Sequence, residues 1–133
     1  MIIETTSFTI KTKGPGDVID LTSKIGEIVR ESKVKNGIVH IFAPHATAVF
    51  VLTELESRLK DDIKNFLEAL VPEGRWKHTG NAHSHLRSML LAPDKTLPVR
   101  NGKIVIGTWQ SLFFIEADTH GRSRRIEVTV MGD

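Results

Sequence analysis

Three histidines lie within eight residues in the stretch RWKHTGNAHSHLRSML (75–90), and histidine is both a common proton carrier and a common metal ligand. His83 and His85 are two residues apart, so a helix would turn their side chains about 200° away from each other. Two such side chains do not chelate one ion, and the stretch has no HExxH or other compact ligand spacing. Because apolar residues follow His85, we predict that His85 faces the protein, that His83 faces solvent, and that His78 lies in a loop.

Three further polar side chains stand where the surrounding pattern is apolar. His45 lies in a tight connection between two apolar stretches, where a rigid sheet can position a functional group. Glu54 ends an apolar strand, and Asp62 falls on the apolar stripe of a helix, where an unpaired carboxylate is costly. Each also has an ordinary interpretation: a turn histidine, a helix N-terminal acid and a residue at the rim of the stripe. Histidines with carboxylates suit proton transfer or a divalent metal, and the set does not distinguish Mg²⁺ from Zn²⁺.

Two later segments carry polar chemistry at strand starts. The segment GTWQ (107–110) presents an aromatic ring and an amide, or else forms a turn anchored by Trp109. The segment GRSRR (121–125) contains three arginines, whose paired donors match phosphate oxygens, or else it is a solvated turn. A nucleic-acid surface is disfavoured because the chain has no tyrosine and no second basic run. His40 lies within an apolar strand and is expected to be a packed or surface histidine.

Composition restricts the class of protein. The 133 residues suit one domain spanning 1–133, and 40% hydrophobic with 26% charged residues is ordinary for a globular chain. The absence of cysteine excludes disulfides and thiolate chemistry, and the net charge of +2 is small. No apolar run approaches the ~20 residues of a membrane helix, and the N-terminus lacks the pattern of a signal peptide. We therefore expect a cytoplasmic protein with neither membrane nor nucleic acid as partner.

The elements that must position these residues follow from hydrophobic periodicity. Amphipathic helices are predicted at 17–32, 55–70 and roughly 82–91. β-Branched and apolar runs predict strands at 2–10, 37–44, 46–54, 102–107, 111–118 and 124–132, with 104–106 and 111–117 as antiparallel neighbours. Glycine, proline and asparagine mark loops at 11–17, 71–81 and 92–102. About seven strands and three helices without βαβ alternation predict an α+β fold with a mostly antiparallel, sandwich-like sheet core.

The chain resembles the YjbQ family, whose members are described as secondary thiamine-phosphate synthases. The likeness rests on PHATAVFVLTE, DD, KH, SHLRSMLL, LPVRNGKIVIGTWQ and GRSRRIEVTVMG, which occur here in the family's order. It runs from about Gly37 to Gly132, and more loosely through the first strand and helix. Two positions depart from the family pattern: Ala46 follows the first histidine, and Thr53 stands where asparagine is usual.

The resemblance implies a set of site residues, carried over by position. It implies the catalytic residues His45, Glu54, His85 and Gln110. It implies the substrate- or phosphate-binding residues Thr47, Trp109, Ser123, Arg124 and Arg125, whereas Arg122 is not a fixed element. It implies that a subset of His45, Glu54, Asp62, His78 and His85 binds a divalent metal, Mg²⁺ or Zn²⁺.

The resemblance also implies an assembly and a reaction. The assembly is a homotrimer with sites near subunit boundaries. In the reaction a hydroxymethylpyrimidine diphosphate loses pyrophosphate while the nitrogen of a thiazole phosphate attacks its methylene carbon. Two alternatives stay open at this point: a metal-dependent hydrolase or other enzyme acting on a small phosphorylated metabolite, and a non-enzymatic trimer that binds such a metabolite. Fold alone does not choose among them.

Overall fold

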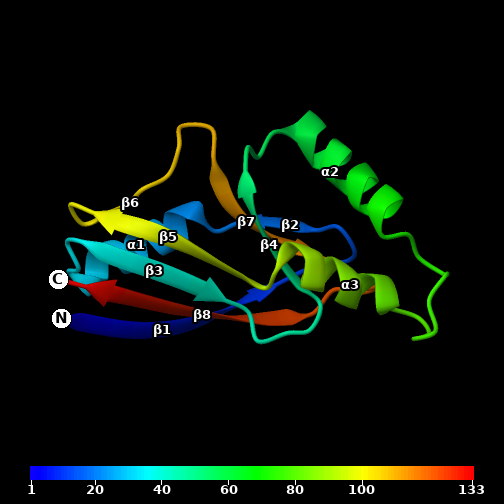
Figure 1. Cartoon of the computed structure of the whole chain (residues 1–133), viewed down its shortest axis with the longest axis horizontal. Coiled ribbons are helices and arrows are strands. Elements are labelled where there is room, and N and C mark those ends of the chain that lie inside the picture. The colour runs from blue at the N-terminus through cyan, green and yellow to red at the C-terminus, as the bar shows by residue number, and fades with distance from the viewer.

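Two antiparallel sheets and three helices form the fold, and the computed structural model describes all 133 residues (Figure 1). The larger sheet has the order β1 (Ile2–Lys11), β8 (Ser123–Gly132), β3 (Gly37–Phe42), β5 (Asp94–Arg100), β6 (Lys103–Ile104). The smaller sheet has the order β2 (Val18–Asp20), β7 (Ser111–Glu116), β4 (Ala48–Thr53). The helices are α1 (Thr22–Ser32), α2 (Ser57–Leu70) and α3 (Ala82–Leu91). The predicted α+β class with an antiparallel, sandwich-like core is confirmed.

The main core lies between the two sheets. Period-2 alternation places Ile126 and Val128 of β8 on the inner face of the larger sheet. From the smaller sheet, the Phe50 and Phe114 rings meet edge to face, with centroids 5.6 Å apart. Helix α1 closes the same core with its buried stripe, which includes Ile25. Burying each such side chain stabilises the fold by about 1.5–3 kcal/mol.

The outer face of the smaller sheet is covered by α2 and α3. Val49 and Phe113 form a second, smaller apolar cluster there, against which Ile63 of α2 packs. Leu67 of the predicted α2 stripe is buried as well, at 4%, but Phe66 and Leu70 of the same stripe are 58% and 50% exposed and so have little apolar contact within the chain. None of the three helices combines the length and the apolar composition needed to cross a bilayer.

The first helix begins later than predicted. Residues 18–20 form the short strand β2 against β7, so α1 starts at Thr22 and not at residue 17. The Asp20 carboxylate accepts hydrogen bonds from the backbone N–H and the hydroxyl of Thr22, at 3.0 and 2.7 Å. It thereby satisfies one of the free N–H groups at the helix start.

The predicted loop 92–102 is mostly strand β5. Pro98 lies opposite Ile38 of β3, and its carbonyl accepts from the N–H of Val105 at 2.8 Å on the other side of the strand. The missing proline N–H faces that same outer side, so the pairing with β3 is intact. The predicted pairing of 104–106 with 111–117 is wrong: β6 pairs with β5, whereas β7 belongs to the other sheet.

Candidate functional site

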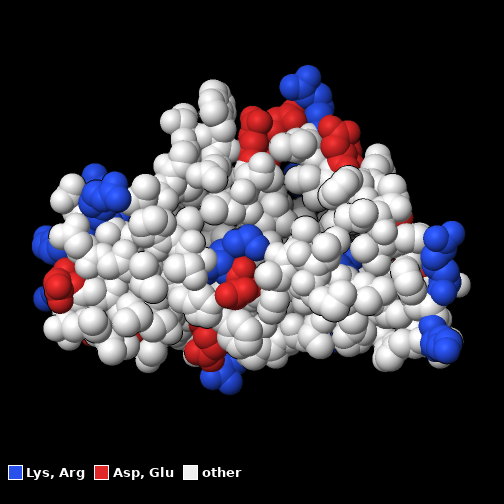
Figure 2. All heavy atoms as spheres, viewed as in Figure 1, with Lys and Arg blue, Asp and Glu red and all other residues white.

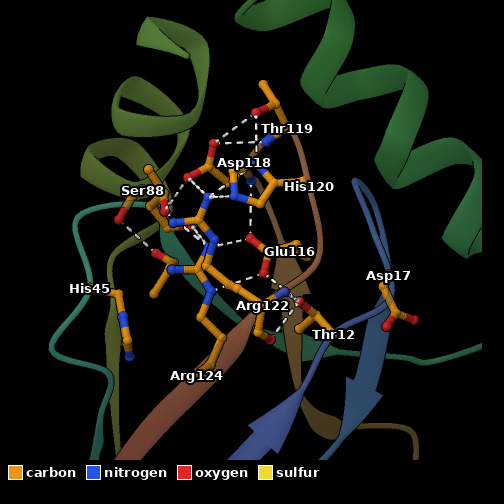
Figure 3. A network of polar contacts seen from close by, with 12 residues as sticks. Thr12, Asp17, His45, Ser88, Glu116, Asp118, Thr119, His120, Arg122 and Arg124 are labelled. Carbon is orange, nitrogen blue, oxygen red and sulfur yellow. Dashed lines mark hydrogen bonds and ion pairs between the residues drawn. The ribbon is translucent and has the colours of Figure 1, made fainter. Parts of the chain in front are cut away.

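A buried ion-pair network joins the end of β7 to the start of β8 (Figure 3). Glu116 and Arg124 are each 1% exposed and form a direct ion pair, in which Arg124 Nε donates to Glu116 Oε1 at 2.9 Å. Arg124 Nη2 also donates to Thr47 Oγ1 at 2.9 Å, and the Thr12 hydroxyl donates to Glu116 Oε1 at 2.6 Å. Buried charges are tolerated only when paired and hydrogen-bonded, and both conditions are met here.

Asp118 extends the network toward α3. Its carboxylate accepts from the Thr47 hydroxyl at 3.1 Å, the Asn81 amide at 3.3 Å and the Thr119 N–H at 2.7 Å. Arg122 Nη2 pairs with it at 2.9 Å. Burial alone would raise the pKa of Asp118, but these hydrogen bonds and the charge of Arg122 together hold its pKa below the usual range. Asp118 is therefore a fixed anion that orients Thr47.

His45 lies at the edge of this network, half-buried and beside its arginines (Figure 3). Its Nε2 accepts a hydrogen bond from the backbone N–H of Arg125 at 2.8 Å. Burial and the charges of Arg124 and Arg122 lower the pKa of His45, and Glu116 opposes this only in part. A nitrogen that accepts from an N–H carries no proton, so the neutral ring has its proton on Nδ1. His45 is thus a neutral hydrogen-bond donor, and its Nε2 is already occupied.

The predicted phosphate-binding residues differ in whether their side chains are available to bind a ligand. Arg124 binds Glu116 and Thr47 through its Nε and Nη2 and is 1% exposed, so its role in this geometry is to support the site. Arg125 is exposed and pairs with Glu127, and Ser123 is exposed at the start of β8. Among the predicted residues, Thr47, Arg124 and the backbone of Arg125 are thus brought together with His45.

Glu54, Gln110 and Trp109 lie at the opposite end of the smaller sheet. The β4–β7 register pairs Thr53 with Ser111, which places Glu54 and Gln110 at the same strand ends. Gln110 Oε1 accepts from a backbone N–H of its own turn at 2.8 Å. Glu54 and the Trp109 ring are exposed. These three residues and the group around His45 therefore lie at opposite ends of the β4–β7 pair.

The helix α3 faces the opposite way from the prediction. His83 is 3% exposed and buried under α2, whereas His85 is half-exposed. The prediction assumed that the apolar residues face inward, but Met89 is 76% exposed. Small polar residues form the contact instead, as when the Ser88 hydroxyl donates to the Ala48 carbonyl at 2.6 Å. A close helix–strand approach favours small side chains, and hydrophobicity gave the wrong face.

His78 and His85 meet even though they belong to a loop and a helix. Their rings are edge to face with centroids 5.1 Å apart, and Trp76 lines the shallow hollow around them. The chain brings together no group of three or more histidine or carboxylate side chains able to hold a metal ion. Asp62 is exposed on α2. The predicted ligand set therefore does not form a metal centre within one chain.

The sequence matches a known family over nearly its whole length. Residues 6–133 match the family model described as "UPF0047 protein YjbQ-like". The chain belongs to the YjbQ family. A UPF0047 protein of Methanothermobacter thermautotrophicus is 40% identical, over 99% of this chain and 94% of that protein, and YjbQ of Escherichia coli O157:H7 is 29% identical, over 96% of each.

Solved structures of YjbQ-like proteins share the fold. A YbjQ-like protein of unknown function from Sulfolobus solfataricus superposes with a TM-score of 0.93 at 35% identity, covering 98% of each chain. A hypothetical protein from Aeropyrum pernix gives 0.88 at 36% identity, covering 98% of this chain and 99% of that one. The descriptions of these relatives name no activity.

Sequence reasoning about this YjbQ-family chain missed Glu116 and Asp118, the two buried carboxylates of the site. The signal was present in SLFFIEAD, where acids follow a fully apolar run. Glu54 was singled out by the same pattern, yet Glu54 is exposed. A carboxylate at the end of an apolar strand can be a buried ion-pair partner, as Glu116 is, or an exposed side chain, as Glu54 is, and its partners in the fold decide which.

Proposed function

We propose that this protein acts on a small phosphorylated metabolite at the sheet edge formed by His45, Arg122 and Arg125, and that the reaction is thiamine-phosphate synthesis. The observation that supports this is the neutral His45, whose Nδ1–H has no partner in the chain and stands beside arginine side chains. Guanidinium and imidazole N–H groups are good donors to phosphate oxygens. The YjbQ resemblance supplies the particular reaction.

The reaction needs a hydrogen-bond donor to the leaving group and does not need a general base. The thiazole nitrogen uses its lone pair to bond the methylene carbon, and pyrophosphate leaves with the electron pair of the broken C–O bond. No proton is removed from the nucleophile. Negative charge grows on the departing oxygen, where a donor fixed in advance stabilises it most effectively. A histidine held neutral, with its proton on Nδ1, meets that need.

The test is formation of thiamine phosphate from hydroxymethylpyrimidine diphosphate and thiazole phosphate, followed by chromatography. Replacing His45 by alanine should lower the rate by about 10²–10³-fold, as for loss of one donor to a developing oxyanion. His40→Ala is the matched control, because His40 is also partly exposed but pairs with Asp94 on the larger sheet. An unchanged rate in His45→Ala would remove His45 from the mechanism. Saturable binding of the diphosphate without any product would replace the synthase with a binding protein.

A second candidate rests on the contact between His78 and His85. Two adjacent imidazoles are the start of a metal site, and a metal-dependent hydrolase of a phosphorylated metabolite would complete the site with ligands from a neighbouring subunit. Such an enzyme should release phosphate from a single substrate and lose activity on chelation or in His85→Ala. Activity that survives both treatments would exclude this candidate. Mg²⁺ and Zn²⁺ are the ions to compare.

The proposed site is expected to lie in a homotrimer. Exposed apolar side chains support association, among them Phe66, Leu70, Met89 and Leu90 on α2 and α3. Figure 2 shows few charged side chains over β3, β5 and α3. A surface with few charges does not repel a second copy of the chain. Sedimentation equilibrium at several concentrations would report the mass of the assembly directly.

A further inference from the structure

A cavity lies between α2, α3 and the outer face of β7. Its inner wall includes Glu116 and Asp118 of the buried network, but not His45 or any other residue predicted to be catalytic or metal-binding. Its volume of about 310 Å³ is at the lower end of the range for small-molecule sites, roughly 300–1,000 Å³. Its apolar wall consists mainly of Val18, Ile63, Leu67, Phe113 and Ile115. The polar side chains that line it come from both helices. This combination of an apolar wall with a few converging charges is typical of a metabolite site.

Arg87 is the most unusual of the lining residues. It is only 9% exposed, and its Nε and Nη2 both donate to one carbonyl oxygen, that of Val71, at 3.2 and 2.9 Å. No carboxylate lies within ion-pair distance, in contrast to the more deeply buried Arg124, which is 1% exposed and which Glu116 neutralises. Nη1 has no partner in the chain. A buried guanidinium without a counter-ion is unfavourable, and an anion in the cavity would remove that penalty.

Two lysines add positive charge along the α2 side of the cavity. Lys60 and Lys64 are four residues apart on one face of the helix, where like charges destabilise the helix slightly. Neither forms an ion pair within the chain. Glu68 and Glu73 also line the cavity; like the two lysines they are exposed, so solvent screens all four of these charges.

The two carboxylates on the inner wall do not offset this charge. Glu116 is neutralised by Arg124, and Asp118 by Arg122. His83, which lines the same wall, stands 3.6 Å from Glu73 Oε1, beyond hydrogen-bond length. Burial lowers the pKa of the Arg87 guanidinium, the charges of Glu73 and Glu68 compensate this only in part, and no carboxylate contacts it.

We propose that this cavity is a second ligand site, which binds a small organic anion. The carboxylate or phosphate group lies against Arg87, between Lys60 and Lys64, and a compact apolar body packs on Phe113 and Ile115. The proposal does not rest on the function proposed above, because His45, Arg122 and Arg125 do not line the cavity, although Glu116 and Asp118 belong both to the cavity wall and to the network beside His45.

The experiment uses four probes on the full chain: phenyl phosphate, benzoate, benzyl alcohol and inorganic phosphate. Affinity is measured by isothermal titration calorimetry, and the position by amide chemical-shift changes in ¹⁵N-labelled protein. We expect at least one aromatic anion to bind, and the neutral alcohol and inorganic phosphate to bind at least tenfold more weakly. Comparison of phenyl phosphate with benzoate then identifies which anion the site prefers. The shifted amides should be those of Leu67, Phe113 and Ile115.

Variants connect binding to the named charges. Lys60→Gln/Lys64→Gln should weaken binding about tenfold or more, because both lysine charges beside the bound anion are lost. Both lysines are exposed on the helix, so the variant should fold as the parent does. Lys11→Gln, on β1, is the matched control and should change nothing. Arg87→Gln should reduce binding further, with its fold checked by circular dichroism.

Three results would overturn the proposal. The first is failure of both aromatic anions to bind at millimolar concentration. The second is equal binding of benzyl alcohol, or equal affinity in the lysine variant and its control. The third is a set of shifted amides around His45 and Arg125, which would assign the anion to the edge of the β7–β8 network.

Discussion

Replacing Glu116 by glutamine tests whether the ion pair with Arg124 holds the candidate site together. The substitution keeps the size of the side chain and an oxygen for the Thr12 hydroxyl, but it removes the only negative charge beside a guanidinium that is 1% exposed. Removal of one partner from a buried pair costs about 3–5 kcal/mol. A chain of this size has a free energy of unfolding of roughly 7–20 kcal/mol, so the loss is large but the fold survives.

The double variant Glu116→Gln/Arg124→Met separates the charge effect from the packing effect. It removes both charges and keeps the acceptor oxygen, so it should recover at least half of the stability lost in Glu116→Gln. Urea unfolding should be followed by far-ultraviolet circular dichroism. Both tryptophans, Trp76 and Trp109, are exposed, so their fluorescence changes little on unfolding. A loss below about 1 kcal/mol in the single variant, or equal losses in both, would refute the assignment of a buried pair.

The other predictions concern pH, backbone contact and association. Because the folded pKa of His45 is lowered, the unfolded chain binds more protons between that pKa and about 6.5, so the free energy of unfolding should fall as pH falls through this window; urea titrations should show a smaller slope in His45→Asn. A Cβ at Gly37 would meet a backbone oxygen at 1.9 Å, so Gly37→Ala should destabilise by more than about 2 kcal/mol in the same assay, whereas Gly14→Ala, with no atom within 4 Å, should stay within about 0.5 kcal/mol. The variant Phe66→Ser/Leu70→Ser should keep its circular dichroism spectrum yet sediment with a lower mass than the parent; an unchanged mass would exclude this helix face from the assembly.

Local pattern predicted most of the fold because most elements bury a periodic face. The run SLFFIEAD and the stripe of α2 gave a strand and a helix close to the observed bounds. Pattern failed where pairing with a distant segment decides the structure. Residues 18–20 have helical periodicity but pair with β7. Pro98 suggested a loop, yet it lies within β5, at a position where its missing N–H does not interrupt the pairing with β3. Tertiary contact overrides propensity in both cases.

The candidate site was predicted less completely because it depends on pairs of side chains that come into contact only in the folded chain. His45 stands on a short connection next to a rigid sheet, which local pattern indicated, whereas Thr47 was predicted only through the family resemblance. Glu116 and Arg124 are eight residues apart and become a site only because β7 and β8 converge. The orientation of α3 was wrong for a related reason, since Ser88 contacts β4 through a hydrogen bond that hydrophobicity does not report.

The distance between the two ends of the β4–β7 pair limits where a site that uses both groups of residues can form. Ala48 pairs with Glu116 and Thr53 with Ser111, so five residue steps, or about 17 Å, separate the His45 end from the Glu54 end. Side chains at the two ends of such a pair do not reach one small substrate together. A reaction that uses both groups therefore requires a second copy of the chain, whose Glu54 end lies against the His45 end of the first. Mixing His45→Ala and Glu54→Ala chains should then restore activity in part, because some mixed interfaces keep both residues. If all the working residues belong to one chain, the mixture stays as inactive as its components.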